Sequence, residues 1–136
     1  MEENRELLEE LMLHVQRQYT QVVEIGKITS ELREALSRDD RESVEILLEL
    51  RQREMEQSDD IERGIRAIID ATDADMQVRL RELLDSKRPL RPEDNGFEAK
   101  KIKELACQIK RSLTQIIESD KALSRKLAGN DSYYKG

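Results

Sequence analysis

ALSRDDRESVEILLELRQREM, residues 35–55, contains the point at which the chain is expected to reverse direction. Its polar cluster, residues 37–40, interrupts a helical pattern of apolar residues, and a second helical pattern starts directly afterwards. Asp39 is suited to cap the second helix, because a carboxylate accepts hydrogen bonds from the free backbone N–H groups of the first turn. Glu42, three residues later, completes a capping-box pair. So short a connection predicts two antiparallel helices, a hairpin.

Apolar residues before this turn alternate in steps of three and four, which is the spacing of a coiled-coil seam. The pattern predicts one helix over residues 4–37, about 50 Å long at about 1.5 Å per residue. The seam consists of Leu8, Leu11, Val15, Val22, Ile25, Leu32 and Leu36, with Gln18 and Thr29 in the remaining places. Further apolar residues beside the seam indicate that this helix packs against more than one neighbour.

The apolar pattern after the turn predicts a second helix over residues 40–87. Its apolar positions include Val44, Leu47, Leu48, Met55, Ile61, Ile65, Ile68 and Ile69. The segment DATDAD, residues 70–75, is poor in helix formers, so the helix is expected to continue or to kink near residues 72–75. The aspartates lack the glycine and the distant glutamate of a calcium loop, which favours a solvated interruption over a metal site. Arg51 lies on the apolar stripe; we expect its guanidinium to extend to the edge, with a role in fixing register as the alternative.

A segment with two prolines and a glycine, residues 89–96, disfavours a continuous helix and is predicted to be a linker after the hairpin of residues 1–88. A last amphipathic helix is predicted over residues 97–129, followed by a tail, residues 130–136. The predicted fold class is therefore all-α. The chain should form one elongated, coiled-coil-like three-helix bundle, built from a long antiparallel hairpin and a third amphipathic helix.

Composition favours long helices over a thick globular core. The 136 residues are 37% apolar and 40% charged, with one Phe, three Tyr and no Trp, whereas globular domains are roughly 45–50% apolar and 25% charged. Helices that bury narrow stripes and expose their other faces fit this composition. Residues 1–71 carry a net charge of −9 and residues 97–136 a net charge of +4. The basic last helix should therefore fold back on the acidic hairpin, with the basic run KKIK, residues 100–103, on its exposed face.

Catalysis, membrane insertion and nucleic-acid binding receive little support. No window approaches the ~18 apolar residues of a membrane span, and the first residues do not resemble a signal peptide. The single histidine, His14, and the single cysteine, Cys107, are better explained as an edge residue and a small buried residue than as a catalytic pair. The basic run lacks stacking aromatics and belongs to an acidic chain. We expect a cytoplasmic protein without enzymatic activity, cofactor, metal or internal disulfide.

The long first helix, the turn, the leucine-spaced second helix, the proline-containing break, the last amphipathic helix and the tyrosine-bearing tail together resemble the flagellar secretion chaperones of the FlgN type. The first turn of that family commonly reads as Leu, a small or polar residue and Asp, followed by a leucine-spaced helix. The matching residues here are Leu36, Asp39 or Asp40, Val44, Leu47 and Leu48. Arg38 stands where such proteins frequently have a glycine.

The resemblance implies a cytoplasmic, non-enzymatic chaperone that keeps hook-filament junction proteins unpolymerised before export. It also points to the last helix as the client-binding element, through a helix-in-groove contact. The predicted client-binding residues are Ile102, Leu105, Ile109, Leu113 and Ile116. The alternative is that these residues complete a three-helix core, and both can hold in turn. Tyr133 and Tyr134 either form a docking motif for the export apparatus or belong to a tail that contacts nothing.

The rival function is that of a structural coiled-coil protein that self-associates through the same seams. Thin cores encourage self-association, because three long helices with so little apolar content bury little surface on their own. A structural protein would form a stable dimer with all its apolar stripes buried. A chaperone is expected to be a monomer or a weak homodimer whose last helix is protected only when a client is bound.

Overall fold

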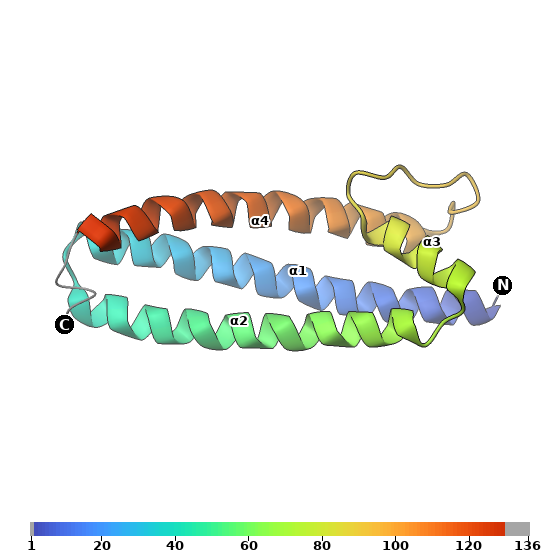
Figure 1. Ribbon diagram of the computed structural model, residues 1–136, viewed down its shortest axis with the longest axis horizontal. Coiled ribbons are helices and arrows are strands. Elements are labelled where there is room, and N and C mark those ends of the chain that lie inside the picture. Colours follow the sequence, from blue (N-terminus) through green and yellow to red (C-terminus); the bar gives the residue numbers. More distant parts are fainter. Residues whose placement is uncertain (1, 130–136) are drawn as a thin grey trace.

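Four α-helices make up the computed structural model, which describes the backbone of residues 2–129 and the side chains of residues 4–126 (Figure 1). The helices are α1 (Glu2–Ser37), α2 (Arg41–Asp70), α3 (Ala74–Leu84) and α4 (Phe97–Gly129). No strand occurs within the described range. The all-α class and the helical bundle predicted from the periodicity are confirmed.

Helix α1 is the central helix of the bundle. It runs between α2 and α4 in Figure 1, antiparallel to α2 and parallel to α4. It packs against both neighbours, whereas contacts between α2 and α4 are sparse. The short helix α3 crosses from the end of α2 to the beginning of α4 and contacts both of them. The last helix thus folds back on the hairpin as expected, and it does so on α1.

The core is divided into two clusters along the bundle. The larger cluster lies at the end where α3 packs and consists of Leu8, Leu11, Val15, Val22, Ile65, Ile69, Leu80, Leu83, Ala99, Ile102, Leu105 and Ile109. The smaller cluster lies toward the turn between α1 and α2 and consists of Ile28, Leu32, Ala35, Val44 and Leu123. All four helices contribute to the first cluster, but among the described side chains of α4 only Leu123 belongs to the second. Residues 112–126 of α4 are therefore held by much less buried apolar surface than residues 97–111.

The predicted second helix is interrupted. Helix α2 ends at Asp70, and α3 begins at Ala74 with Asp73 as its N-cap. The Asp73 carboxylate accepts a hydrogen bond from the backbone N–H of Met76 at 2.8 Å, and the Thr72 hydroxyl donates to the Ile69 carbonyl at 2.7 Å. The aspartate-rich segment therefore ends one helix and caps the next. Thr and Asp favour such positions, because their side chains form hydrogen bonds with the nearby backbone. The last helix has the predicted bounds.

Asp40, and not the predicted Asp39, caps α2. The Asp40 carboxylate accepts hydrogen bonds from the backbone N–H of Ser43 at 3.2 Å and from its hydroxyl at 2.7 Å. These two bonds, the side-chain bond first, hold the pKa of Asp40 below its ordinary value. Asp39 instead adopts the left-handed conformation, with φ 55°, and so reverses the chain. The N-cap lies one residue later than predicted. Both aspartates suit either position, because Asp is favoured at N-caps and also tolerates the left-handed conformation.

Asp40→Ala should lower the melting temperature by a few degrees at neutral pH, because Ser43 loses its acceptor. The folded-state pKa of Asp40 is lowered, so its stabilisation is present above the unfolded-state pKa and is lost as the pH falls through the folded-state pKa. In thermal melts from neutral pH down to about pH 3, the difference in melting temperature between the wild type and Asp40→Ala should become smaller. Asp39→Gly keeps the cap and should melt close to the wild type. A difference in melting temperature that stays the same at every pH would contradict a role for the ionised Asp40 carboxylate.

Candidate helix-binding surface

The five residues predicted to bind a client are divided between the core and the surface. Ile102, Leu105 and Ile109 are buried, at most 7% exposed, and belong to the larger core cluster. Ile116 is partly buried and packs against that cluster. Leu113 is 39% exposed. In this conformation the set completes the core of the bundle, and Leu113 is the member that is open to solvent.

Leu113 lies on the side of α4 that is turned toward α2. It is seven residues from both Ala106 and Asp120, so these three side chains share one face of the helix. Ala106 lines a hollow together with residues of α2, and Asp120 forms an ion pair with Arg51 of α2. Ile117, one turn after Leu113, lines a surface hollow with Asp120 and is 53% exposed. The α2-facing side of α4 therefore carries two exposed apolar side chains.

Helix α2 has a matching apolar side. Leu48 and Met55 are seven residues apart and are 40% and 42% exposed. By helical spacing they share a face with Arg51, which reaches α4, and with Glu62, which lines the hollow shared with α4. Because contacts between α2 and α4 are sparse, neither helix covers the other here. We call the surface formed by Leu48, Met55, Leu113 and Ile117 the open face.

Arg51 joins the three long helices beneath the open face. Its side chain is 14% exposed, and its Nη2 donates to both carboxylate oxygens of Asp120 at 2.6 Å. Its Nε donates to the hydroxyl of Thr29 on α1 at 3.1 Å, and that hydroxyl donates to the Ile25 carbonyl at 2.8 Å. The sequence favoured a side chain extended to a solvated edge. The structure instead places it in an inter-helix bridge, because α4 supplies a carboxylate that the hairpin pattern alone does not reveal.

Helix α3 closes one end of the open face and is held there by Lys103 of α4. Lys103 Nζ donates to the backbone carbonyls of Glu82, Asp85 and Arg88 at 2.6, 2.6 and 2.7 Å. A cation at the carbonyl end of a helix also interacts favourably with the helix dipole. The expectation that the whole basic run lies on an exposed face is therefore wrong for Lys103, whose charge is used within the bundle.

The segment predicted as a linker is anchored by ion pairs. Arg79 of α3 pairs with Asp94, whose side chain is buried. Arg91 Nε donates to Glu82 at 2.6 Å. This hydrogen bond lowers the pKa of Glu82 and raises that of Arg91. The beginning of α4 is thus tied to α3 and is not free to leave the hairpin on a loose connection.

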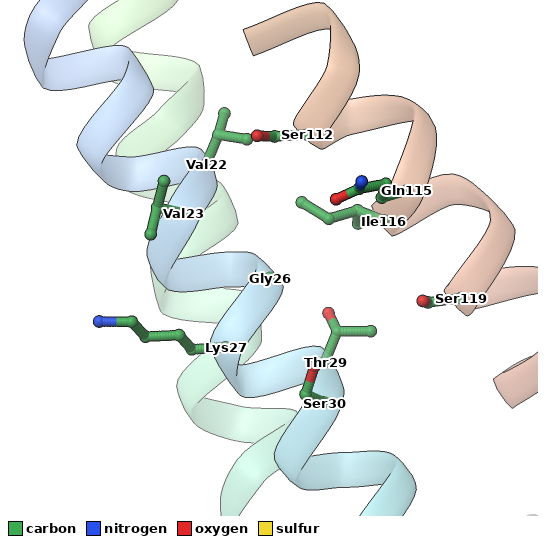
Figure 2. A pocket seen from close by; sticks show the side chains of 10 residues that line it. All are labelled: Val22, Val23, Gly26, Lys27, Thr29, Ser30, Ser112, Gln115, Ile116 and Ser119. Atoms are coloured by element: carbon green, nitrogen blue, oxygen red, sulfur yellow. The ribbon is translucent and has the colours of Figure 1, made fainter. Parts of the chain in front are cut away.

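A third hollow, of about 340 Å³, lies between α1 and α4 (Figure 2). Ile116 of α4 points toward α1 near Gly26, while Lys27 points away from α4. The remaining lining residues are Val22, Val23, Thr29 and Ser30 of α1 and Ser112, Gln115 and Ser119 of α4. No buried side-chain polar atom lacks a hydrogen-bond partner in the part of the chain that the structure describes.

The other candidates for chemistry lie away from the open face. His14 lies against Gly64 of α2, and Cys107 is a partly buried free thiol on α4. Within the described residues, no group of three His, Cys, Asp or Glu side chains is placed to hold a metal ion. None of the helices there is long and apolar enough to cross a membrane. Tyr133 and Tyr134 lie outside the described residues.

Comparisons of this chain with protein-family models, with curated proteins and with solved structures found no match. The resemblance of the turn and of the helix order to FlgN-type chaperones stays a prediction.

Gly26→Ala should stabilise the protein by up to about 1 kcal/mol, because alanine is the better helix former. The added Cβ would lie 3.7 Å from the side chain of Ile116, an ordinary packing distance, so the hollow accepts the methyl group. Gly64→Ala is the matched control: its Cβ would lie 3.3 Å from His14 Cδ2, so the imidazole must move. Urea unfolding should give the larger gain at Gly26. A larger gain at Gly64 would contradict the packing argument.

Asp120→Ala should destabilise the second half of α4 by roughly 1–2 kcal/mol. This lies between the free energies that exposed and buried ion pairs contribute to stability. The reason is that Arg51 keeps only its Thr29 partner beneath the open face. Native-state hydrogen exchange should become faster over residues 112–126 and stay unchanged over residues 99–109. Glu118→Ala, an exposed carboxylate on the same helix, is the control. Uniformly faster exchange along α4 would show that the bridge has no local role.

Proposed function

We propose that this protein is a non-enzymatic binding protein that takes up an amphipathic helix of another protein on its open face. The observation that carries the proposal is that α2 and α4, which are antiparallel (Figure 1), each have two large apolar side chains, 39–53% exposed, on the side that helical spacing turns toward the other helix. Single exposed apolar residues are common on soluble proteins, but contiguous apolar surfaces mark interaction sites. Helices α2 and α4 lie side by side with α1 between them, and a groove of this kind accepts the side chains that a partner helix presents at steps of three and four.

The finer proposal is a cytoplasmic export chaperone of the FlgN type that acts on the hook-filament junction proteins of the bacterial flagellum. The support is the resemblance in the first turn and in the order of the helices. Such subunits polymerise through amphipathic terminal helices, so a protein that covers one of these helices would keep the subunit unpolymerised until secretion. Leu113 belongs both to the predicted client-binding set and to the open face. In this proposal the tail with Tyr133 and Tyr134 would contact the export apparatus.

The second candidate is a structural coiled-coil protein that self-associates. The same exposed apolar residues favour it, because two copies could bury their open faces against each other. The two functions differ in oligomeric state and in the partner that is bound. A structural protein forms a stable dimer in isolation, whereas a chaperone is a monomer or a weak dimer that binds its client.

Met55→Asp combined with Leu113→Asp should weaken the binding of a purified hook-filament junction protein at least tenfold, about 1.4 kcal/mol. Both positions are exposed, so circular dichroism and the melting temperature should stay near those of the wild type. Isothermal titration calorimetry measures the affinity. Leu13→Asp, at an apolar position of α1 that is 53% exposed, is the matched control and should bind normally. Ile109 is unsuitable, because a charge in the core would unfold the bundle.

The outcomes separate the candidates. If purified junction proteins do not bind the wild-type protein, the flagellar assignment is wrong. If sedimentation shows a stable dimer that the double substitution converts to a monomer, self-association is the function of the open face. Binding that the double substitution leaves unchanged would place the client site elsewhere.

A further inference from the structure

The edge of the open face formed by α2 is acidic. Glu45 lies three residues before Leu48, and Asp59 lies four residues after Met55, so each carboxylate is one helical turn from an apolar residue of the face. We call the exposed acidic residues along this edge the acidic rim: Glu45, Glu49, Glu56 and Asp59. A partner on the open face would therefore meet negative charge on the α2 side.

The edge formed by α4 is basic. Lys110 lies three residues before Leu113, and Lys121 lies four residues after Ile117. Arg125 follows Lys121 by one turn and lines the same surface hollow as Ile117. We call the three exposed cations the basic rim: Lys110, Lys121 and Arg125. The open face thus lies between two rims of opposite charge.

The two rims are available to a partner. Asp120, beside the basic rim on α4, is bound to Arg51, and these two charges neutralise each other beneath the face. Glu118, three residues before Lys121, is an exposed carboxylate next to the basic rim, whose three cations still leave this edge with a net positive charge. Across the described part of the chain, the acidic rim forms no ion pair with the basic rim. Glu56 does accept a hydrogen bond from Gln52 on its own helix at 3.4 Å. The α2–α4 spacing therefore leaves both rows of charge solvated.

Helix α3 shows that a helix fits against this side of the bundle. It contacts both α2 and α4, and its residues Arg81 and Leu84 line the hollow of about 330 Å³ at the end of the open face. Beyond α3, the stretch of α2 from Glu62 back to Leu48 extends about 20 Å at about 1.5 Å per residue. A partner helix of about four turns would occupy that length.

A second copy of the chain fits this surface less well than a separate helix. A two-fold axis parallel to the helices would place each acidic rim on a basic rim, but it would also bring α3 of one copy against α3 of the other. A two-fold axis perpendicular to the helices would separate the α3 helices, but it would place like rims on each other. Like charges opposed at an interface are destabilising. Both symmetric arrangements therefore carry a cost that a single helix avoids.

We propose that the partner is an amphipathic helix of a different protein whose apolar stripe has basic residues along one flank and acidic residues along the other. The basic flank contacts the acidic rim, and the acidic flank contacts the basic rim. Because reversing a helix exchanges its two flanks, this charge pattern also fixes the direction in which the partner lies. The inference rests on the proposed function, helix binding at the open face, and adds the chemistry of the helix that is selected.

Four designed peptides of about eighteen residues test this selection. All carry Leu at the a and d positions of a heptad pattern and Ala and Gln on the outer face. They differ at the two flanks, which carry Lys on one side and Glu on the other, Lys on both, Glu on both, or Gln on both. By fluorescence anisotropy at low ionic strength, the Lys/Glu peptide should bind the full-length protein about tenfold more tightly than either single-sign peptide. The difference should shrink at about 1 M salt, where the Debye length is about 3 Å.

Charge reversals in the protein provide the matched variants. Replacement of all four acidic-rim residues by Lys reverses the charge of that rim and should transfer the preference to the peptide with Glu on both flanks. Lys110→Glu with Lys121→Glu should transfer it to the peptide with Lys on both flanks. All six positions are exposed, so each variant should keep the circular dichroism spectrum of the wild type. A transfer in both directions would support contact with both rims, because a merely structural effect would not change the sign of the preference.

The remaining outcomes separate this inference from the proposed function. Equal binding of all four peptides would overturn the charge selection and leave helix binding in place. Failure of every peptide to bind, the Gln peptide included, would count against helix binding itself and therefore against both. A stable dimer that binds peptide only after the copies dissociate would assign the open face to a second copy and overturn the inference. A peptide with Ser in place of Leu should not bind, and tight binding of it would exclude the apolar face as the contact.

Discussion

Helix α1 has apolar side chains on two sides, and the arrangement of the other helices depends on this. Its buried residues include Leu11, Val15, Val22, Ile28 and Leu32, which are too widely distributed for one neighbour to cover. Helices α2 and α4 each bury their own narrower stripe against α1. Each keeps two large apolar side chains on the side that faces the other, but these stay 39–53% exposed and the two helices do not close over them. The sparse contact between α2 and α4 is therefore a consequence of how apolar residues are distributed among the helices.

The same distribution makes the two ends of the bundle unequal. At one end, twelve buried residues from all four helices form the larger cluster, and Lys103 and the pair Arg79–Asp94 fasten α3 and the following segment. Toward the other end, the smaller cluster contains five buried residues among those whose side chains the structure describes. There the bridge from Arg51 to Asp120 is the ion pair that joins α2 to α4. Proteins open most easily where buried apolar contacts are fewest, so the open face lies beside the part of α4 that is best able to adjust to a partner.

The sequence predicts the helices well because helical periodicity and caps are local signals. The cap was displaced by one residue, since Asp39 and Asp40 suit both positions and only the backbone angle at Asp39 distinguishes them. The partner of Arg51 could not be predicted, because Asp120 is 69 residues away in the chain. Periodicity identifies an apolar face but not its neighbour. For this reason Ile102, which is buried, and Leu48, which is exposed, gave the same signal in the sequence.

The net charges of the hairpin and of the last helix do not explain how these parts are joined. In the described structure, two ion pairs link α4 to the hairpin: Arg5–Glu98 and Arg51–Asp120. In both, the acidic hairpin supplies the cation and the basic helix supplies the carboxylate. Docking of α4 on α1 therefore depends on apolar burial and leaves the excess charge of both parts unused. That excess charge forms the two rims. The rims do not form ion pairs with each other, and a helix placed between them would pair with both.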